Sequence, residues 1–286
     1  MSLIQPNQIL TQLGEISTDE FLRDYWQQKP LLIRQAFPNF QSPLSSNELA
    51  GLACDTDTAR LVLEKGGSSP WEVRHGPLRK KDFKNLPATH WTLLVNDIEK
   101  LLPEFAEIIE PFRFIPDWRI DDLMISYAVE GGSVGPHVDA YDVFLLQAQG
   151  QRHWQISHQA CTEDNFISDI DLRIMREFVA QEEWTLEPGD MLYLPPDVPH
   201  YGVAVGECMT YSIGFRAPSR ADLLEDLLGQ ILEQPEMQER FRDPKRSLQA
   251  DPSKLAEADL ERLTEFVLQA LPDRAAIRSW LQETLG

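Results

Sequence analysis

The sequence predicts a mainly β fold with flanking helices, of the α+β class, followed by a helical segment. Two observations lead to this prediction. Residues 120–215 contain several short apolar stretches separated by turn residues, without βαβ spacing, which is typical of an antiparallel sandwich or barrel. From Pro218 onward, apolar residues recur at helical spacing instead. We therefore expect one domain over residues 1–217 and a helical segment over residues 218–286.

The stretch before residue 120 is predicted to add short helices and strands to this domain. Ser17 is followed three residues later by Glu20, and Ser45 by Glu48, which is the capping-box pattern that begins helices. Apolar residues at helical spacing predict one helix over Asn96–Phe112. The predicted strands are Leu31–Ile33, Arg60–Glu64, Trp71–Arg74 and Trp91–Val95, and the second and third form a hairpin around Gly66–Pro70.

The barrel is predicted from short apolar strands bounded by turn residues. They are Leu123–Val129, Val143–Ala148, His153–Ile156, Trp184–Leu186, Met191–Leu194 and Met209–Phe215. Residues 158–183 are richer in charge, and within them Asp169–Val179 could form a helix laid on the sandwich or part of a lid.

The helical segment carries more apolar surface than one surface helix needs. Ser219 is placed to cap the first of three predicted helices. Stripes this broad either pack together within one chain or bury against another chain. Their apolar residues are Leu223, Leu224, Leu227, Leu228, Ile231 and Leu232, then Leu260, Leu263, Phe266, Val267 and Leu271, then Ile277, Trp280, Leu281 and Leu285.

Composition limits the possible partners. The chain has 26 Lys and Arg against 46 Asp and Glu, a net charge of −20, which argues against direct binding of nucleic acid through a basic face. This charge fits a basic partner, and it equally fits solubility alone. The three cysteines form no C-x-x-C pair, and no secretory signal or membrane-spanning apolar run is present. We expect a cytoplasmic protein with reduced thiols.

Three residues are candidate metal ligands. His137 and Asp139 are two apart, so on a strand their side chains point to the same face and can bind one ion. His200, far downstream, would supply a third ligand from another strand. Two histidines and one carboxylate leave open positions on the metal, as in non-haem Fe(II) oxygenases. Taken alone, His137 and Asp139 could equally be a solvated loop pair.

The setting of His200 favours the metal site and carries a resemblance. Gly189, Pro195 and His200 have the spacing G-x5-P-x4-H, which resembles the second metal motif of cupins. With the H-x-D motif, it resembles the JmjC branch of 2-oxoglutarate oxygenases, and it is more closely similar to the bacterial ribosomal oxygenases, which hydroxylate an arginine of a large-subunit ribosomal protein. The similar segments are Pro116–Ser126, Gly135–Gln147, Gly150–Trp154, Gly189–His200 and Tyr211–Pro218, with weaker similarity back to about residue 20.

This resemblance implies a double-stranded β-helix, the cupin/JmjC jelly roll, over residues 1–217. It also implies a homodimer through the C-terminal helices and a basic ribosomal protein as substrate. In the family, a winged-helix module follows the dimerising helices. Because this sequence stops at Gly286, we expect that module to be absent here.

The resemblance further implies Fe(II), 2-oxoglutarate and O2 as reactants, with His137, Asp139 and His200 on the metal. The far carboxylate of 2-oxoglutarate needs a cation, and a guanidinium can hold it with two parallel bonds. Arg152 stands where the family places its cosubstrate arginine, and Ser126 matches the family's hydroxyl partner. Without the family, Arg152 could equally form a surface ion pair.

Candidate substrate contacts come from residues near the metal motif. Tyr141 and Asp142 follow it closely, and a carboxylate with an aromatic face can hold a guanidinium. We predict that both contact an arginine substrate. Weaker candidates lie just before the Ser126 strand, where exposed acids are usually solvated. They are Asp117, Trp118, Asp121 and Asp122.

These observations lead to a 2-oxoglutarate- and Fe(II)-dependent dioxygenase that hydroxylates a ribosomal protein arginine. One alternative is a small-molecule cupin metalloenzyme that does not use 2-oxoglutarate, and Arg152 argues against it. Another is a non-enzymatic acidic binder of basic ribosomal proteins, and the intact His137, Asp139 and His200 set argues against that.

Overall fold

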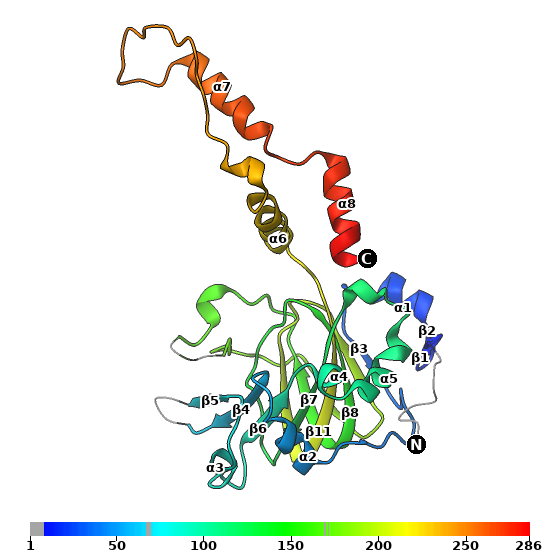
Figure 1. Ribbon diagram of the computed structural model, residues 1–286. Helices are drawn as coiled ribbons and strands as arrows, with labels where there is room; N and C mark the ends of the chain where they lie inside the picture. The colour runs from blue at the N-terminus through cyan, green and yellow to red at the C-terminus, as the bar shows by residue number, and fades with distance from the viewer. Residues whose placement is uncertain (1–8, 67–69, 169, 171) are drawn as a thin grey trace. The chain divides into compact units, whose positions relative to one another are not determined.

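The computed structural model describes residues 9–66, 70–168, 170 and 172–286. The chain divides into two compact units, Met1–Ala217 and Pro218–Gly286. The first is built on a large sheet with short helices, and the second is helical (Figure 1).

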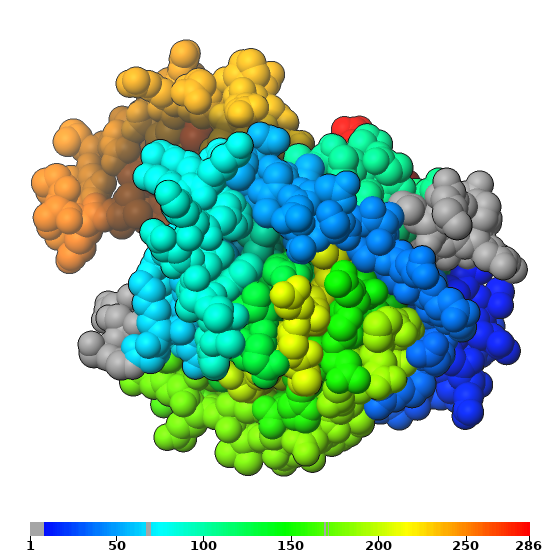
Figure 2. Space-filling view, turned by 90° about the horizontal axis from the view of Figure 1, so that it is seen from below, coloured from blue at the N-terminus to red at the C-terminus, as the bar shows by residue number. Residues whose placement is uncertain are grey.

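Among the described residues, nine strands form one antiparallel sheet in the order β3-β10-β8-β11-β7-β6-β4-β5, with β9 also paired to β8. This confirms the antiparallel fold class. The view from below shows segments of β7, β11 and β8 side by side (Figure 2). The strands are β3 (Leu31–Ile33), β4 (Ala59–Glu64), β5 (Trp71–His75), β6 (Trp91–Val95), β7 (Ile120–Ala128), β8 (Asp142–Ile156), β9 (Glu182–Leu186), β10 (Met191–Leu194) and β11 (His200–Phe215); β1 (Gln12–Leu13) and β2 (Ile16–Ser17) form a separate ladder.

The two central strands are longer than predicted. The predicted strands Val143–Ala148 and His153–Ile156 are parts of one strand, β8, which continues through Gly150. Gly150 has a φ of +63°, and a Cβ there would lie 2.1 Å from the carbonyl oxygen of Glu207, so glycine is needed at this close approach. Its partner β11 begins at His200 rather than near Met209. The metal-ligand candidate His200 therefore opens a strand paired along most of its length with β8.

Short helices cover one face of the sheet. Phe21, Leu49, Ile98 and Ile108 come from four of them and are buried in one cluster with strand residues such as Ile125. The helices therefore pack against one face of the sheet, and the residues of its other face line a cavity. The helices are α1 (Thr18–Asp24), α2 (Ser46–Leu52), α3 (Lys80–Phe83), α4 (Ile98–Leu101) and α5 (Ala106–Ile109), with 3-10 turns at Pro103–Phe105, Glu110–Phe112, Asp117–Arg119 and Glu163–Asn165.

The single helix predicted over Asn96–Phe112 is wrong. The structure breaks it into α4, α5 and two 3-10 turns, and each 3-10 turn contains a proline, Pro103 or Pro111. Proline has no N–H to donate and its ring clashes with the preceding turn, so the apolar stripe is kept while the helix is interrupted. The capping box predicted at Ser45 and Glu48 is confirmed at α2.

The helix alternative for Asp169–Val179 is not seen in the part of that range that the structure describes. Positions 169 and 171 of this prediction lie outside the described residues, and residues 172–179 contain no helical turn. Met175 instead forms an isolated bridge with Phe166, and its N–H donates to the carbonyl of Pro136. This contact ties the segment to the loop that carries His137.

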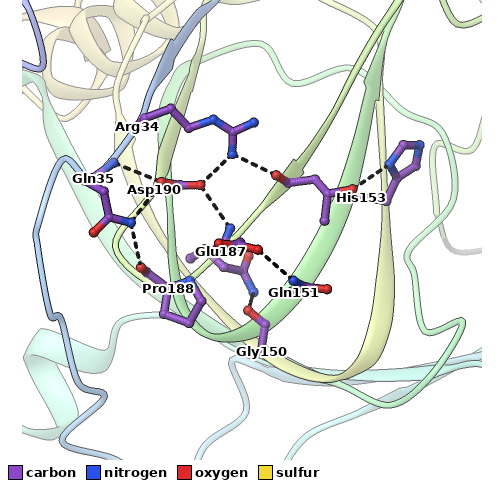
Figure 3. Close-up of polar contacts among 10 residues, drawn as sticks. Arg34, Gln35, Gly150, Gln151, His153, Glu187, Pro188 and Asp190 are labelled. Carbon is purple, nitrogen blue, oxygen red and sulfur yellow. Dashed lines mark hydrogen bonds and ion pairs between the residues drawn. The ribbon is translucent and has the colours of Figure 1, made fainter.

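A buried acid anchors the turn before β10. Asp190 is 2% exposed, and its carboxylate accepts from the N–H groups of Gln35 (2.9 Å) and Glu187 (3.1 Å) and from Arg34 Nη1 (2.6 Å), as Figure 3 shows. Burial by itself would raise the pKa of Asp190, but these hydrogen bonds outweigh it and the pKa lies below its usual value. The turn is therefore held by a charge that is fully satisfied within the chain.

The second unit contains the three predicted helices, α6 (Arg220–Leu232), α7 (Glu257–Leu268) and α8 (Arg274–Leu285), with a 3-10 turn at Pro235–Gln238. Leu227 and Ile231 of α6 are buried with Trp280 of α8, so these two helices pack together. Within the described residues, no helix is long and apolar enough to cross a membrane. Large apolar side chains nevertheless remain exposed in this unit, among them Leu224, Leu228, Leu232, Leu260, Val267, Leu268 and Leu271.

Candidate functional site

The three predicted metal ligands lie together at one end of β11. The Nε2 atoms of His137 and His200 lie 3.9 Å and 3.5 Å from Oδ2 of Asp139. The potential ligand atoms of all three are within 4.8 Å of one another. Backbone hydrogen bonds join His137 to His200 in both directions, so the register of these two segments sets the spacing of the imidazoles.

Each imidazole is oriented by a backbone carbonyl. His137 Nδ1 lies 2.9 Å from the carbonyl oxygen of Gly135, and His200 Nδ1 lies 2.9 Å from that of Val198. A carbonyl can only accept, so each Nδ1 carries the proton and donates it, and each Nε2 lone pair is free to bind a metal. Burial, together with the neighbouring His137, lowers the pKa of His200 to about 4, so His200 is neutral at pH 7 as a ligand must be.

The triad opens into a cavity of about 600 Å³. Its walls are alternate residues of β4, β6, β7, β8 and β11, while the residues between them face the helix-covered core. A further part of the lining is mainly apolar and consists of Phe166, Ile167, Ile170, Leu172 and Ile174, with Glu163 and Arg173 beside them. The lining includes His137, Asp139, His200, Ser126, Arg152, Trp154, Thr210, Val143, Leu145, Met124, Asp122, Asn96, Arg60, Tyr141, Phe166, Ile167, Leu172 and Ile174.

Arg152 is a buried cation without an anion. It is 3% exposed, and burial lowers its pKa, although a guanidinium remains charged at neutral pH. Its Nη2 donates to the carbonyl of Gly202 at 3.3 Å, and its Nε has no hydrogen-bond partner. No carboxylate among the described residues forms an ion pair with it. A buried charge is usually paired, so this position fits the far carboxylate of a bound dicarboxylate.

Ser126 lies on the same cavity wall as Thr210. The two residues are opposite each other in the β7–β11 pair, and Ser126 Oγ donates to the Thr210 carbonyl at 3.4 Å. Thr210 Oγ1 in turn donates to Gln147 Oε1 at 3.1 Å. Both hydroxyls line the cavity together with Arg152, so polar groups of the right kind for a carboxylate are present on this wall.

The two predicted substrate residues are separated by the structure. Tyr141 lines the cavity, whereas Asp142 is fully buried and is not among the lining residues. Asp142 accepts hydrogen bonds from Tyr193 Oη (2.6 Å), Gln27 Nε2 (2.9 Å) and Arg119 Nη2 (3.0 Å). Its carboxylate is thus already satisfied by the chain and does not face the site.

Asp122, considered only weakly from the sequence, lines the cavity beside Tyr141. Burial raises its pKa, and Asn96 Nδ2 donates to it at 2.8 Å. The sequence did contain the signal for this position. Asp122, Met124 and Ser126 are two residues apart on β7, so their side chains point to the same face of the strand. The prediction that Ser126 faces the cavity therefore also predicts that Asp122 and Met124 face it.

The residues present fit a metal and a 2-oxo dicarboxylate. Two imidazoles whose Nε2 atoms face one carboxylate are the donor set of non-haem Fe(II) sites with open positions. Arg152 with its unpartnered Nε, and the Ser126 and Thr210 hydroxyls, are the donor set for a carboxylate in the same cavity.

Residues 107–223, which include the triad, match the family described as JmjC domain. The chain is 37% identical over 268 residues to the ribosomal protein uL16 3-hydroxylase of Escherichia coli, covering 93% of this chain and 70% of that protein. It is 35% identical over 278 residues to a probable ribosomal oxygenase of Haemophilus influenzae, covering 95% of this chain and 68% of that protein.

Solved structures agree with these sequence relatives. The X-ray structure of E. coli ycfD matches with a TM-score of 0.82 at 36% identity, covering 97% of this chain and 73% of that one. A structure of E. coli YcfD in complex with cobalt and 2-oxoglutarate matches with a TM-score of 0.76 at 36% identity, covering 94% and 70%. The large antiparallel sheet with its helices is therefore the JmjC/cupin fold, and the chain belongs to the JmjC-type ribosomal oxygenase family.

Proposed function

We propose that this chain is an Fe(II)- and 2-oxoglutarate-dependent dioxygenase that hydroxylates an arginine of a large-subunit ribosomal protein. The observation that carries the proposal is Arg152, a buried guanidinium without an acidic partner among the described residues, in the cavity that also holds the triad. The relative in E. coli named as a ribosomal protein uL16 3-hydroxylase supports the substrate class.

The chain's part in the reaction is to bind, orient and exclude water. His137, Asp139 and His200 would hold the metal, and Arg152 with Ser126 would hold the far carboxylate of 2-oxoglutarate. When bound, Fe(II) couples the decarboxylation of 2-oxoglutarate by dioxygen to hydroxylation of a C–H bond, which yields succinate, carbon dioxide and the alcohol. The apolar wall formed by Ile167, Ile174 and their neighbours limits access of water to this chemistry.

An arginine substrate is favoured by the other end of the cavity. The carboxylate of Asp122 and the ring of Tyr141 both line it, and an acid with an aromatic face suits a guanidinium. Tyr141 is 36% exposed, yet partial desolvation of its hydroxyl, together with Asp139 and Asp122, raises its pKa, so the hydroxyl stays neutral and can donate a hydrogen bond. A bound guanidinium would offset the cost of burying the Asp122 charge.

The helical unit is proposed to form a homodimer. Leu224, Leu228 and Leu232 lie one turn apart on α6 and stay exposed within their own unit, while the neighbouring face of α6 is covered by α8. The net charge of −20 suits a basic ribosomal protein as partner, and it disfavours direct contact with nucleic acid. A substrate of this class would place the enzyme in the cytoplasm.

Anaerobic loading with Fe(II), followed by oxygen and 2-oxoglutarate, tests the proposal. Succinate release should be stimulated by an arginine-containing peptide from a basic ribosomal protein, and mass spectrometry should find one added oxygen atom on that arginine. Succinate without peptide modification would reject the substrate class. No succinate under any condition would favour a small-molecule cupin enzyme that does not use 2-oxoglutarate, or a non-enzymatic acidic binder of basic ribosomal proteins.

A further inference from the structure

Trp154 lies between the two ends of the proposed cosubstrate site. It is 6% exposed, lines the cavity, and follows Arg152 by two residues on β8, so both side chains are on the same face. The guanidinium carbon of Arg152 is 5.3 Å from the centroid of the indole. The imidazole of His200 is 5.9 Å from it, measured between ring centroids. The indole therefore contacts both the cosubstrate cation and a metal ligand.

Small residues of β11 make room for this indole. In the β8–β11 pair, Trp154 is opposite Gly202, and Arg152 is opposite Ala204. A Cβ added to Gly202 would lie 2.6 Å from Cζ3 and 2.7 Å from Cη2 of Trp154. Gly202 itself is not among the residues that line the cavity, because the indole occupies the space above it.

Gly202 is not required for its backbone conformation. Its φ is not in the positive region, unlike that of Gly150 or Gly206 on the same two strands. An alanine would fit the backbone at this position, and the three atoms nearest its Cβ would all belong to the ring of Trp154. The glycine thus serves to let a large aromatic ring lie close to the sheet.

We propose that Trp154 is a specificity-determining residue whose indole forms the floor of the compartment for the 2-oxo acid, with its depth set by Gly202. The inference rests on the proposed use of 2-oxoglutarate. The carbon chain of the 2-oxo acid runs from the triad to Arg152 and passes over the indole face. A ring lying close to Gly202 leaves room for this chain, and a ring displaced from Gly202 removes it.

The test is a double-mutant cycle read out as binding rather than turnover. Isothermal titration of 2-oxoglutarate into the anaerobic Co(II)-loaded protein gives the Kd for the wild type, Gly202→Ala, Trp154→Leu and the double variant. Gly202→Ala should weaken binding about tenfold, because the added methyl lifts the indole into the compartment. The double variant should bind more tightly than Gly202→Ala alone, because leucine no longer conflicts with the methyl. Gly51→Ala in α2, where a Cβ meets open space, is the matched control and should bind like the wild type.

The outcomes separate this inference from the proposed function. A wild type that does not bind 2-oxoglutarate overturns both. Wild-type binding that is unchanged in Gly202→Ala, or a double variant no tighter than Gly202→Ala, overturns the floor assignment alone. Trp154→Phe gives a second test that does not crowd the sheet. Its smaller ring should lower the ratio of the Kd for 2-oxoadipate to that for 2-oxoglutarate by about threefold or more, and an unchanged ratio contradicts the proposal.

Discussion

Asp190 and Arg152 are buried charges with opposite surroundings. Both are at most 3% exposed, and both belong to the strands that form the barrel or to the turns between them. The carboxylate of Asp190 accepts hydrogen bonds from Gln35, Glu187 and Arg34, so the chain satisfies it completely (Figure 3). The guanidinium of Arg152 has one long bond to a carbonyl and an unpartnered Nε.

This difference separates a charge that the chain satisfies by itself from one that, in the proposed function, binds a ligand. Burying an ion is costly, and Asp190 offsets that cost with hydrogen bonds that the folded chain makes by itself. Arg152 has only a long bond to the Gly202 carbonyl and the nearby ring of Trp154, and no anion among the described residues, so most of that cost is not offset by the chain itself. The two residues should therefore respond in opposite ways when their charge is removed.

The largest expected effect is the loss of metal binding at the triad, which lines the same cavity as Arg152. His137→Ala should abolish metal binding and metal-dependent turnover, because two ligands remain from a set of three. The free energy of unfolding should change little, since the side chain of His137 is partly exposed and lies outside the buried apolar clusters. Metal content and succinate release measure the first effect, and denaturant unfolding measures the second. His158→Ala, which removes a half-exposed histidine paired with Glu182, is the matched control and should keep both properties.

Removal of the satisfied charge should weaken the fold. Asp190→Ala leaves the N–H groups of Gln35 and Glu187 without their acceptor, which should lower the free energy of unfolding by about 2–4 kcal/mol. Metal affinity should stay within about twofold of wild type, since Asp190 does not line the cavity. A stable Asp190→Ala protein would show that the turn does not depend on this carboxylate.

Removal of the unsatisfied charge should not weaken the fold. Arg152→Met keeps a long side chain and eliminates the buried guanidinium, so the free energy of unfolding should be unchanged or rise by up to about 3 kcal/mol. Denaturant unfolding without added ligand measures this directly. A loss of stability comparable with that of Asp190→Ala would mean that Arg152 is paired within the chain. It would contradict the difference drawn between the two buried charges.

The smallest effect concerns pH. The pKa of Asp190 is lowered in the folded protein, so its contribution to stability is present above the unfolded value of about 3.9 and is lost as the pH falls through the folded value. The difference in unfolding free energy between the wild type and Asp190→Asn should be constant near neutral pH and shrink below about pH 4. If this difference in unfolding free energy grew as the pH fell, the pH-dependent stabilisation would have to come from a group other than Asp190.

The clustering of His137, Asp139 and His200 could be predicted from short local patterns, whereas Arg152 was assigned from the family resemblance. The H-x-D spacing of His137 and Asp139 suggested one shared metal, although the strand expected there is a loop in which only His137 forms an isolated bridge, and the prolines before His200 mark a fixed corner. Long-range geometry was harder to predict. Gly150 and Gly206 look like turn residues, so the continuity of β8 and β11 was missed, and a regular apolar stripe concealed the interruptions at Pro103 and Pro111.

The substrate end shows why nearness in sequence misleads. Asp142 is closer to the metal motif than Asp122, yet Asp142 is held by Tyr193, Gln27 and Arg119 away from the cavity. Neighbouring residues of a strand point to opposite faces, and Val143 of β8 lines the cavity, so Asp142 points away from it. Asp122 lines the cavity because it lies on the same face of β7 as Ser126.

The most direct test of the central claim is the affinity of 2-oxoglutarate for the anaerobic Co(II)-loaded wild type and for Arg152→Met. If Arg152 is held unpaired to receive a carboxylate, the wild type should bind and the variant should bind about 10- to 100-fold more weakly, the loss expected for charged hydrogen bonds. Equal affinity in the two proteins would contradict the claim and would assign the buried guanidinium a purely structural role.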